Sequence, residues 1–134
     1  MLMPMLARYM TRNPQTIARS ATMAEAHRVM RQHQIRHLPV MDGGRVVGIV
    51  SLYDLHLLET LPGVSPDDVA VEDAMSPDVY VASARDELPD VVDRMVSAKI
   101  GSAVVLDADG SLVGIFTTID ALRALAEILR REAA

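Results

Sequence analysis

The sequence predicts an α/β protein built from two copies of one β-α-β-β-α unit. Three segments of the first half recur in the second half, in the same order and about 65 residues further along the chain. Three matches in register indicate an internal duplication rather than chance similarity. The matched pairs are 10–17 with 75–81, 34–42 with 99–107, and 48–54 with 114–120.

Each copy begins with an extended lead-in and an amphipathic helix. In the first copy Thr22 precedes Glu25 by three residues, the spacing of a capping box, and apolar residues then recur on one helical face. In the second copy Pro89 is expected in the first helical turn, where its missing N–H leaves no bond unmade. The two apolar stripes are Met23, Ala26, Val29 and Met30, and Leu88, Val91, Val92, Met95 and Val96.

A β-hairpin and a second helix complete each copy. The turn residues Asp42-Gly43-Gly44 and Asp109-Gly110 lie between β-rich runs and indicate hairpins. Strands are predicted at 38–41, 46–50, 103–106 and 112–116, and helices at 52–61 and 118–131. The repeats are placed at 7–61 and 71–127, with a turn-rich connector at 62–70. One repeat buries little surface alone, so we expect the two to pack about a pseudo-two-fold axis that leaves paired clefts for ligands.

The composition excludes several classes of function. The 134 residues suit one compact unit or two closely packed small ones. The absence of cysteine removes disulfides, thiolate zinc sites and a cysteine nucleophile. A net charge of −5 and an aromatic content of 3% argue against binding nucleic acid. No signal peptide is evident and no apolar stretch reaches the ~18 residues of a membrane span, so we expect a cytoplasmic protein outside membranes.

The pattern that carries chemistry is Gly-x-x-Ser/Thr-x-x-Asp, which occurs at 48–54 and 114–120 where a strand leads into a helix. One interpretation is structural, because a hydroxyl three residues before an acid forms a capping box. The other is functional: the hydroxyl and the free N–H groups of a helix start suit a phosphate oxygen, and the acid can accept both hydroxyls of a ribose. The glycine would let backbone or ligand approach closely. A carboxylate has about four acceptor positions, so the two interpretations are compatible.

The tandem units, the Met-Thr…Pro lead-in, the run Arg36-His37-Leu38-Pro39-Val40 and the doubled acid motif resemble a pair of CBS (cystathionine β-synthase) domains, a Bateman module. The resemblance covers about residues 7–125. It implies a regulatory module that binds adenosine-containing ligands (AMP, ADP, ATP, S-adenosylmethionine or NAD) in clefts between the repeats. It also implies a disc-like homodimer, and no cofactor is implied beyond such a regulatory ligand.

The nucleotide-binding positions of that family match residues in both repeats. Asp54 and Asp120 match the acid that binds ribose. Ser51 and Thr117 match the hydroxyl on the phosphate side. The matched strand starts are Arg36, His37, Leu38, Ser102 and Ala103, and the matched lead-in residues along the adenine are Thr16, Ile17, Tyr80 and Val81. The second repeat has Gly101-Ser102 where the first has Arg36-His37, so one filled site or two unequal sites are expected.

Three hypotheses about function are compatible with these residues. The first is a sensor without catalysis, in which the bound adenosine ligand alters contacts with an effector protein. The second is a dimerisation or scaffold module that binds no ligand, with the two acids serving only as helix caps. The third, an enzyme, is disfavoured, because the CBS pairs of IMP dehydrogenases accompany a separate catalytic barrel with a cysteine that this sequence does not contain.

Four weaker signals concern phosphate contacts, metals and assembly. Arg12 and Arg123 are further candidates to meet a phosphate. His27 and His33 are six residues apart, which is not the spacing of a helical metal pair, so no metal site is predicted. The helical run Leu122, Leu125, Ala126 and Leu129 is expected either in a dimer interface or in the core, and residues 129–134 are expected to fray.

Overall fold

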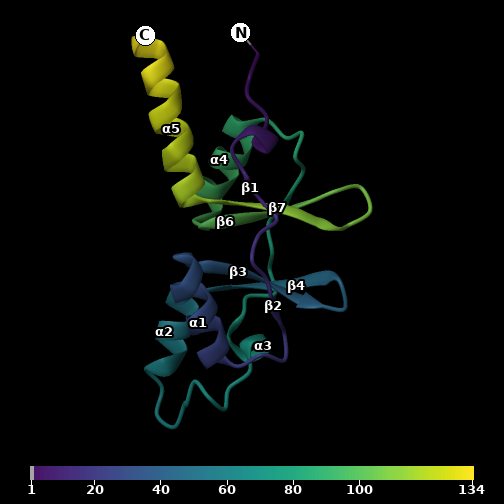
Figure 1. The fold of residues 1–134 in the computed structure, drawn as a ribbon, viewed down its shortest axis with the longest axis vertical. Helices are drawn as coiled ribbons and strands as arrows, with labels where there is room; N and C mark the ends of the chain where they lie inside the picture. The colour runs from purple at the N-terminus through teal and green to yellow at the C-terminus, as the bar shows by residue number, and fades with distance from the viewer. Residues whose placement is uncertain (1) are drawn as a thin grey trace. The chain divides into compact units, whose positions relative to one another are not determined.

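The computed structural model describes residues 2–134, which form two compact units (Figure 1). The Asp54 unit spans Pro14–Val79. The Asp120 unit consists of Tyr80–Ala134 together with the N-terminal residues up to Asn13. Both units combine a sheet with helices, so the predicted α/β class is confirmed. Packing of the repeats about a pseudo-two-fold axis stays a prediction.

The Asp54 unit has a three-stranded sheet in the order β2-β3-β4. The central strand β3 pairs in parallel with β2 and antiparallel with β4. Helices α1 and α2 lie next to each other on one side of this sheet (Figure 1). The elements are β2 (Ile17–Ala18), α1 (Met23–His33), β3 (His37–Asp42), β4 (Arg45–Ser51), α2 (Leu52–Glu59) and α3 (Val71–Ala74).

The Asp120 unit has a four-stranded sheet in the order β1-β7-β6-β5. Its strands β5, β6 and β7 repeat the pairing of β2, β3 and β4, and the N-terminal strand β1 is added antiparallel to β7. The elements are η1 (Leu6–Arg8), β1 (Thr11–Arg12), β5 (Val81–Ala82), α4 (Leu88–Ala98), β6 (Ser102–Leu106), β7 (Leu112–Thr117) and α5 (Thr118–Ala133).

The predicted β-α-β-β-α order is confirmed in both repeats, with small corrections at the ends of helices. Helix α2 ends at Glu59 rather than at 61, because Thr60 caps it and the turn at Pro62-Gly63 follows. Helix α5 continues to Ala133 rather than ending at 131, and fraying of residues 129–134 stays a prediction. The short elements η1 and α3 were not predicted, because three or four residues are too few to show a helical period.

Each lead-in pairs with two different hairpins. β2 lies beside β3 of its own repeat, but Thr11, six residues earlier, pairs with Ile115 on β7 of the second repeat. Conversely, Ser76 in the second lead-in pairs with Ile49 on β4 of the first repeat. The start of each lead-in therefore belongs to the unit that holds the other repeat.

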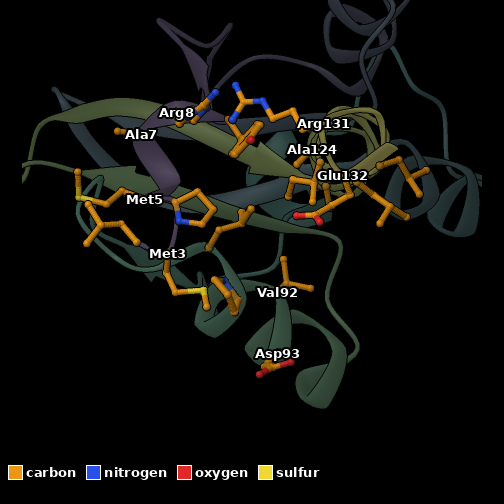
Figure 2. A pocket seen from close by; sticks show the side chains of 18 residues that line it. Met3, Met5, Ala7, Arg8, Val92, Asp93, Ala124, Arg131 and Glu132 are labelled. Atoms are coloured by element: carbon orange, nitrogen blue, oxygen red, sulfur yellow. The ribbon is translucent and has the colours of Figure 1, made fainter. Parts of the chain in front are cut away.

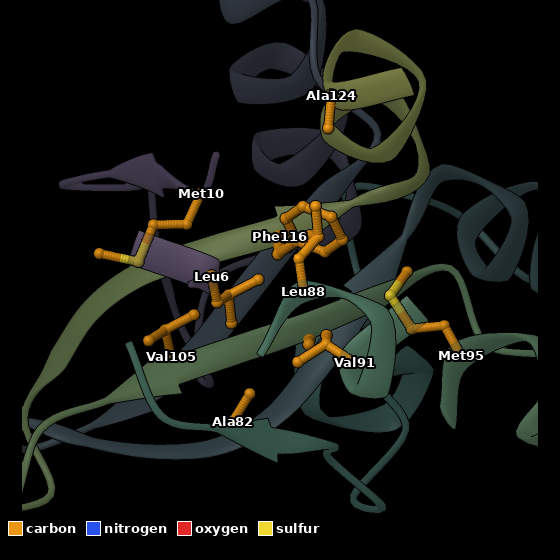
Figure 3. Packing of buried hydrophobic residues seen from close by; sticks show 10 residues of the cluster. Leu6, Met10, Ala82, Leu88, Val91, Met95, Val105, Phe116 and Ala124 are labelled. Atoms are coloured by element: carbon orange, nitrogen blue, oxygen red, sulfur yellow. The ribbon is translucent and has the colours of Figure 1, made fainter. Parts of the chain in front are cut away.

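The predicted helix stripes face the two cores. In the Asp54 unit Met23, Ala26 and Met30 are buried against β3 and β4. In the Asp120 unit Leu6 and Met10 of the N-terminal segment join Phe116 and the face of α4 (Figure 3). Val96 is 70% exposed, so its place in the predicted stripe is wrong. Helix α4 therefore buries a narrower face, with Leu88, Val91 and Met95, than the sequence stripe suggests.

Candidate functional site

In the Asp54 unit a capping box places the candidate acid at the start of α2. The Ser51 hydroxyl accepts from the Asp54 N–H at 3.0 Å, and Asp54 Oδ2 accepts from the Ser51 N–H at 2.9 Å. Asp54 is half-buried, and its Oδ1 accepts no hydrogen bond from residues 2–134. The structural interpretation of the motif is therefore confirmed here, while one carboxylate oxygen is left with its acceptor positions unused.

The strand start that carries Arg36 and His37 lies beside this box. His37 is opposite Ser51 in the sheet, and the Leu52 N–H donates to the Arg36 carbonyl at 2.8 Å. Burial lowers the pKa of His37; the Asp54 carboxylate opposes this shift and the Arg36 charge adds to it. His37 is therefore neutral at pH 7 and can donate or accept a hydrogen bond. Arg36 is exposed and makes no side-chain ion pair within the described chain.

The same backbone arrangement recurs in the Asp120 unit. Ser102 is opposite Thr117 across β6 and β7, and the Thr118 N–H donates to the Gly101 carbonyl at 3.2 Å. Gly101 and Ser102 bring no charge to this edge, in contrast to Arg36 and His37. The two candidate sites therefore share their backbone and differ in the chemistry of their strand starts.

Asp120 itself is bonded far more completely than Asp54. It is 3% exposed. Its Oδ2 accepts from the Thr117 N–H at 2.9 Å and from the Thr117 hydroxyl at 3.3 Å. Its Oδ1 accepts from the Thr11 hydroxyl at 2.9 Å and from Arg123 at 3.0 Å. Four donors fill about the four acceptor positions that a carboxylate has.

The remaining predicted residues differ in what they can offer a ligand. Leu38 and Ala103 are fully buried and Ile17 is nearly so, so their side chains belong to the cores. Thr16 is exposed and Val81 is 50% exposed. Tyr80 is half-buried, its carbonyl accepts from the Val104 N–H, and Arg94 lies 5.5 Å from the centre of its ring. Burial raises the pKa of Tyr80, which keeps its phenol protonated at neutral pH. Ligand contact at these residues stays a prediction.

The motif glycines are explained by backbone packing. A Cβ at Gly48 would lie 2.9 Å from the Ser76 carbonyl oxygen, and one at Gly114 would lie 3.0 Å from that of Thr11. Of the two expectations, approach by backbone or by ligand, the structure supports the first. Sequence reasoning missed Thr11 as a partner of Asp120, although the duplicated Met-Thr and Met-Ser lead-ins marked the equivalent positions.

Each unit carries a groove of its own. A groove of about 360 Å³ beside Asp54 is lined by Leu57, Leu58, Leu61 and Asp73 together with Thr60 and Ala74. A larger one, of about 950 Å³, lies in the Asp120 unit among the N-terminal segment, α4 and α5 (Figure 2). Its walls are mainly apolar, and Leu122 and Leu125 beside it are 60% and 53% exposed. Asp54, the acid with the free oxygen, is itself part of the lining of the smaller groove.

The described residues offer neither a metal site nor a membrane-spanning helix. Among residues 2–134 no three His, Asp or Glu side chains are grouped so as to hold a metal ion. In the same part of the chain, no helix is both long and apolar enough to cross a bilayer.

Comparison with known proteins identifies the family. The CBS domain matches residues 6–57 and again residues 71–127. The chain belongs to the CBS domain family. A solved structure from Vibrio cholerae, of a protein provisionally named for acetoin utilization (AcuB), is 30% identical. The match covers 99% of this chain and 98% of that one, with a TM-score of 0.86.

Two further relatives of this CBS pair have been solved with ligands. The structure of CBSX2 in complex with AMP is 28% identical, covers 92% of this chain and 97% of that one, and has a TM-score of 0.77. The CBS domain pair of protein MJ0100, in complex with 5-methylthioadenosine and S-adenosyl-L-methionine, is 25% identical with a TM-score of 0.78. That match covers 91% of this chain and 99% of that one.

Longer curated proteins also match. The chloroplastic CBSX2 of Arabidopsis thaliana is 27% identical over 88% of this chain and 61% of its own length. The chain spans only 35% and 44% of the two Methanocaldococcus jannaschii proteins MJ1232 and MJ0188, at 28% and 26% identity. The match therefore shows a shared CBS region and says nothing of the remaining parts of those proteins.

Proposed function

We propose that this CBS pair is a regulatory module that binds an adenosine-containing ligand through Asp54 and conveys its occupancy to a partner protein. The observation that carries the proposal is the state of Asp54: half-buried, held by Ser51, and with Oδ1 free of hydrogen bonds from the described residues. An ordered carboxylate oxygen that is already partly desolvated suits the paired hydroxyls of a ribose. The candidate ligands are AMP, ADP, ATP, S-adenosylmethionine and NAD.

The surroundings of Asp54 support the same class of ligand. Arg36 provides a cation without an ion pair in residues 2–134, which favours a phosphate. His37 is neutral and can accept or donate a hydrogen bond to a base or a sugar. AMP in CBSX2, and the two adenosine compounds in MJ0100, are relatives' ligands that contain the ribose this site suits.

Titration with an adenine nucleotide panel tests this proposal. A ligand present at 100 times its Kd stabilises the folded state by about 2.7 kcal/mol, which raises Tm by several degrees. We expect at least one of AMP, ADP, ATP, S-adenosylmethionine and NAD to do so. Asp54→Asn should strongly reduce the shift while keeping an acceptor for the Ser51 N–H, and Asp93→Asn, at an exposed position, should retain it. No shift with any ligand at millimolar concentration would reject the sensor.

A specific observation favours a second, compatible function in assembly. The apolar groove of the Asp120 unit is lined by Leu122 and Leu125 of α5, each more than half exposed. We propose that a second copy of the chain covers this face and forms a homodimer. If no ligand binds, dimerisation is the only function proposed for the module. Leu125→Asp should shift the mass measured by light scattering from dimer to monomer. Val96→Asp, at a 70% exposed valine outside the groove, should leave the dimer intact.

A further inference from the structure

Asp120 is closed off by two side chains whose counterparts in the Asp54 unit make no hydrogen bond to Asp54. The Thr11 hydroxyl and the Arg123 guanidinium both donate to Oδ1 of Asp120. The corresponding oxygen of Asp54 is free, because the Ser51 N–H donates to Oδ2. The residue equivalent to Arg123 is Leu57, which has no donor. Asp120 is 3% exposed as a result, whereas Asp54 is half-buried.

The hydroxyls of the two lead-ins, on Thr11 and Ser76, differ in whether they bond to the nearby acid. Thr11 pairs with Ile115 next to Gly114, and Ser76 pairs with Ile49 next to Gly48, so the two hydroxyls occupy equivalent positions. The Ser76 hydroxyl makes no hydrogen bond in the described part of the chain, while the Thr11 hydroxyl reaches Asp120 at 2.9 Å. The backbone contacts are shared, so the two units differ in the hydrogen bond that the lead-in hydroxyl makes.

We propose that Thr11 and Arg123 form a latch on Asp120. Ribose hydroxyls bind Asp54 directly, but they reach Asp120 only after the Thr11 hydroxyl has left Oδ1. The Asp120 position is consequently the weaker of the two. This inference rests on the proposed function, since it concerns the same class of ligand.

Opening the latch has a consequence for the N-terminal segment. Thr11 lies on β1, and the preceding residues Leu6 and Met10 are in the core of the Asp120 unit (Figure 3). Met3 and Met5, which precede Leu6 in the same segment, line the large apolar groove (Figure 2). A ligand at Asp120 therefore loosens the segment that forms one wall of the proposed dimer surface, which couples occupancy to assembly.

Calorimetric titration with AMP tests the latch in chains whose Asp54 position is silenced by Asp54→Asn. We expect Thr11→Val, which keeps the β-branched shape but removes the donor, to tighten AMP binding about tenfold, as the loss of one competing charge-assisted hydrogen bond implies. Arg123→Leu, which copies the equivalent residue and alters an exposed side chain, should act in the same direction. Ser76→Ala is the matched control and should change nothing.

The outcomes separate the latch from the proposed function. Two equal AMP sites in the unmodified protein, or no gain from either Thr11→Val or Arg123→Leu, would overturn the latch and leave ligand binding standing. Absence of AMP binding in every variant, with no shift from the wider ligand panel, would reject both. Hydrogen exchange of residues 10–12 without ligand gives a second readout: it should rise in Thr11→Val and stay unchanged in Ser76→Ala.

Discussion

The Asp54 and Asp120 units start their second helices in the same way and use the acid differently. In both, an aspartate accepts from the N–H of the residue three positions earlier, at 2.9 Å. Within residues 2–134, the Asp54 carboxylate accepts no other hydrogen bond. The Asp120 carboxylate accepts from three further donors. The comparison shows that a capping box can leave one carboxylate oxygen free, and that neighbouring side chains decide whether it stays free.

The largest expected difference between the units is in stability. Asp120→Ala removes the partner of four donors in a buried place, and we expect it to lower the free energy of unfolding by about 2–3 kcal/mol. Asp54→Ala removes only a helix cap, and we expect a loss of about 1 kcal/mol. Urea unfolding of the two variants measures both values. Equal losses would show that the additional bonds of Asp120 contribute nothing, and the contrast drawn here would be wrong.

A second loss of stability should be the same in both units, so the expected difference between them is smaller. Gly48→Ala and Gly114→Ala each bring a Cβ against a lead-in carbonyl oxygen, at 2.9 Å from Ser76 and 3.0 Å from Thr11. Crowding of this kind costs about 1–3 kcal/mol, which unfolding experiments can detect. Ser97→Ala on the exposed side of α4 is the control and should lie within about 0.5 kcal/mol of the parent.

The same pair of substitutions also separates the units by function. Moving the Thr11 backbone in Gly114→Ala should weaken the bond from its hydroxyl to Asp120, and so raise AMP affinity at that acid. Gly48→Ala displaces Ser76, which bonds to no carboxylate, and should give no such gain. A gain in both variants would mean that the lead-ins restrict both acids alike.

Local patterns in the sequence were sufficient for most of the fold. The bond from the Glu25 N–H to the Thr22 hydroxyl, the hairpin turn at Gly43 and Gly44, and the early position of Pro89 in α4 all follow from neighbours within a few residues. The two glycines take φ values of 57° and 90°, a region that side chains rarely adopt, so their presence predicted the turn directly. The duplication strengthened each of these predictions, because every element was predicted twice.

What the sequence could not predict depends on contacts between distant residues. Thr11 and Asp120 are 109 positions apart, and no periodicity or spacing links them. The pairing of Thr11 with Ile115 of the second repeat, rather than with a strand of its own repeat, is likewise a contact between residues far apart in the sequence. The candidate acids were therefore identified correctly as helix caps, but the difference in their accessibility required the structure.

The smallest expected effect concerns His37, whose equivalent, Ser102, does not titrate. Because burial lowers the pKa of His37 in the folded protein, the unfolded chain takes up its proton first as pH falls. The contribution of neutral His37 is complete above the ordinary pKa of about 6.5 and is lost as pH falls through that value toward the lower folded one. Comparison of urea midpoints from pH 8 to pH 5 should show a steeper loss in the parent than in His37→Gln. An NMR titration that places the pKa of His37 above 6.5 would contradict this sign.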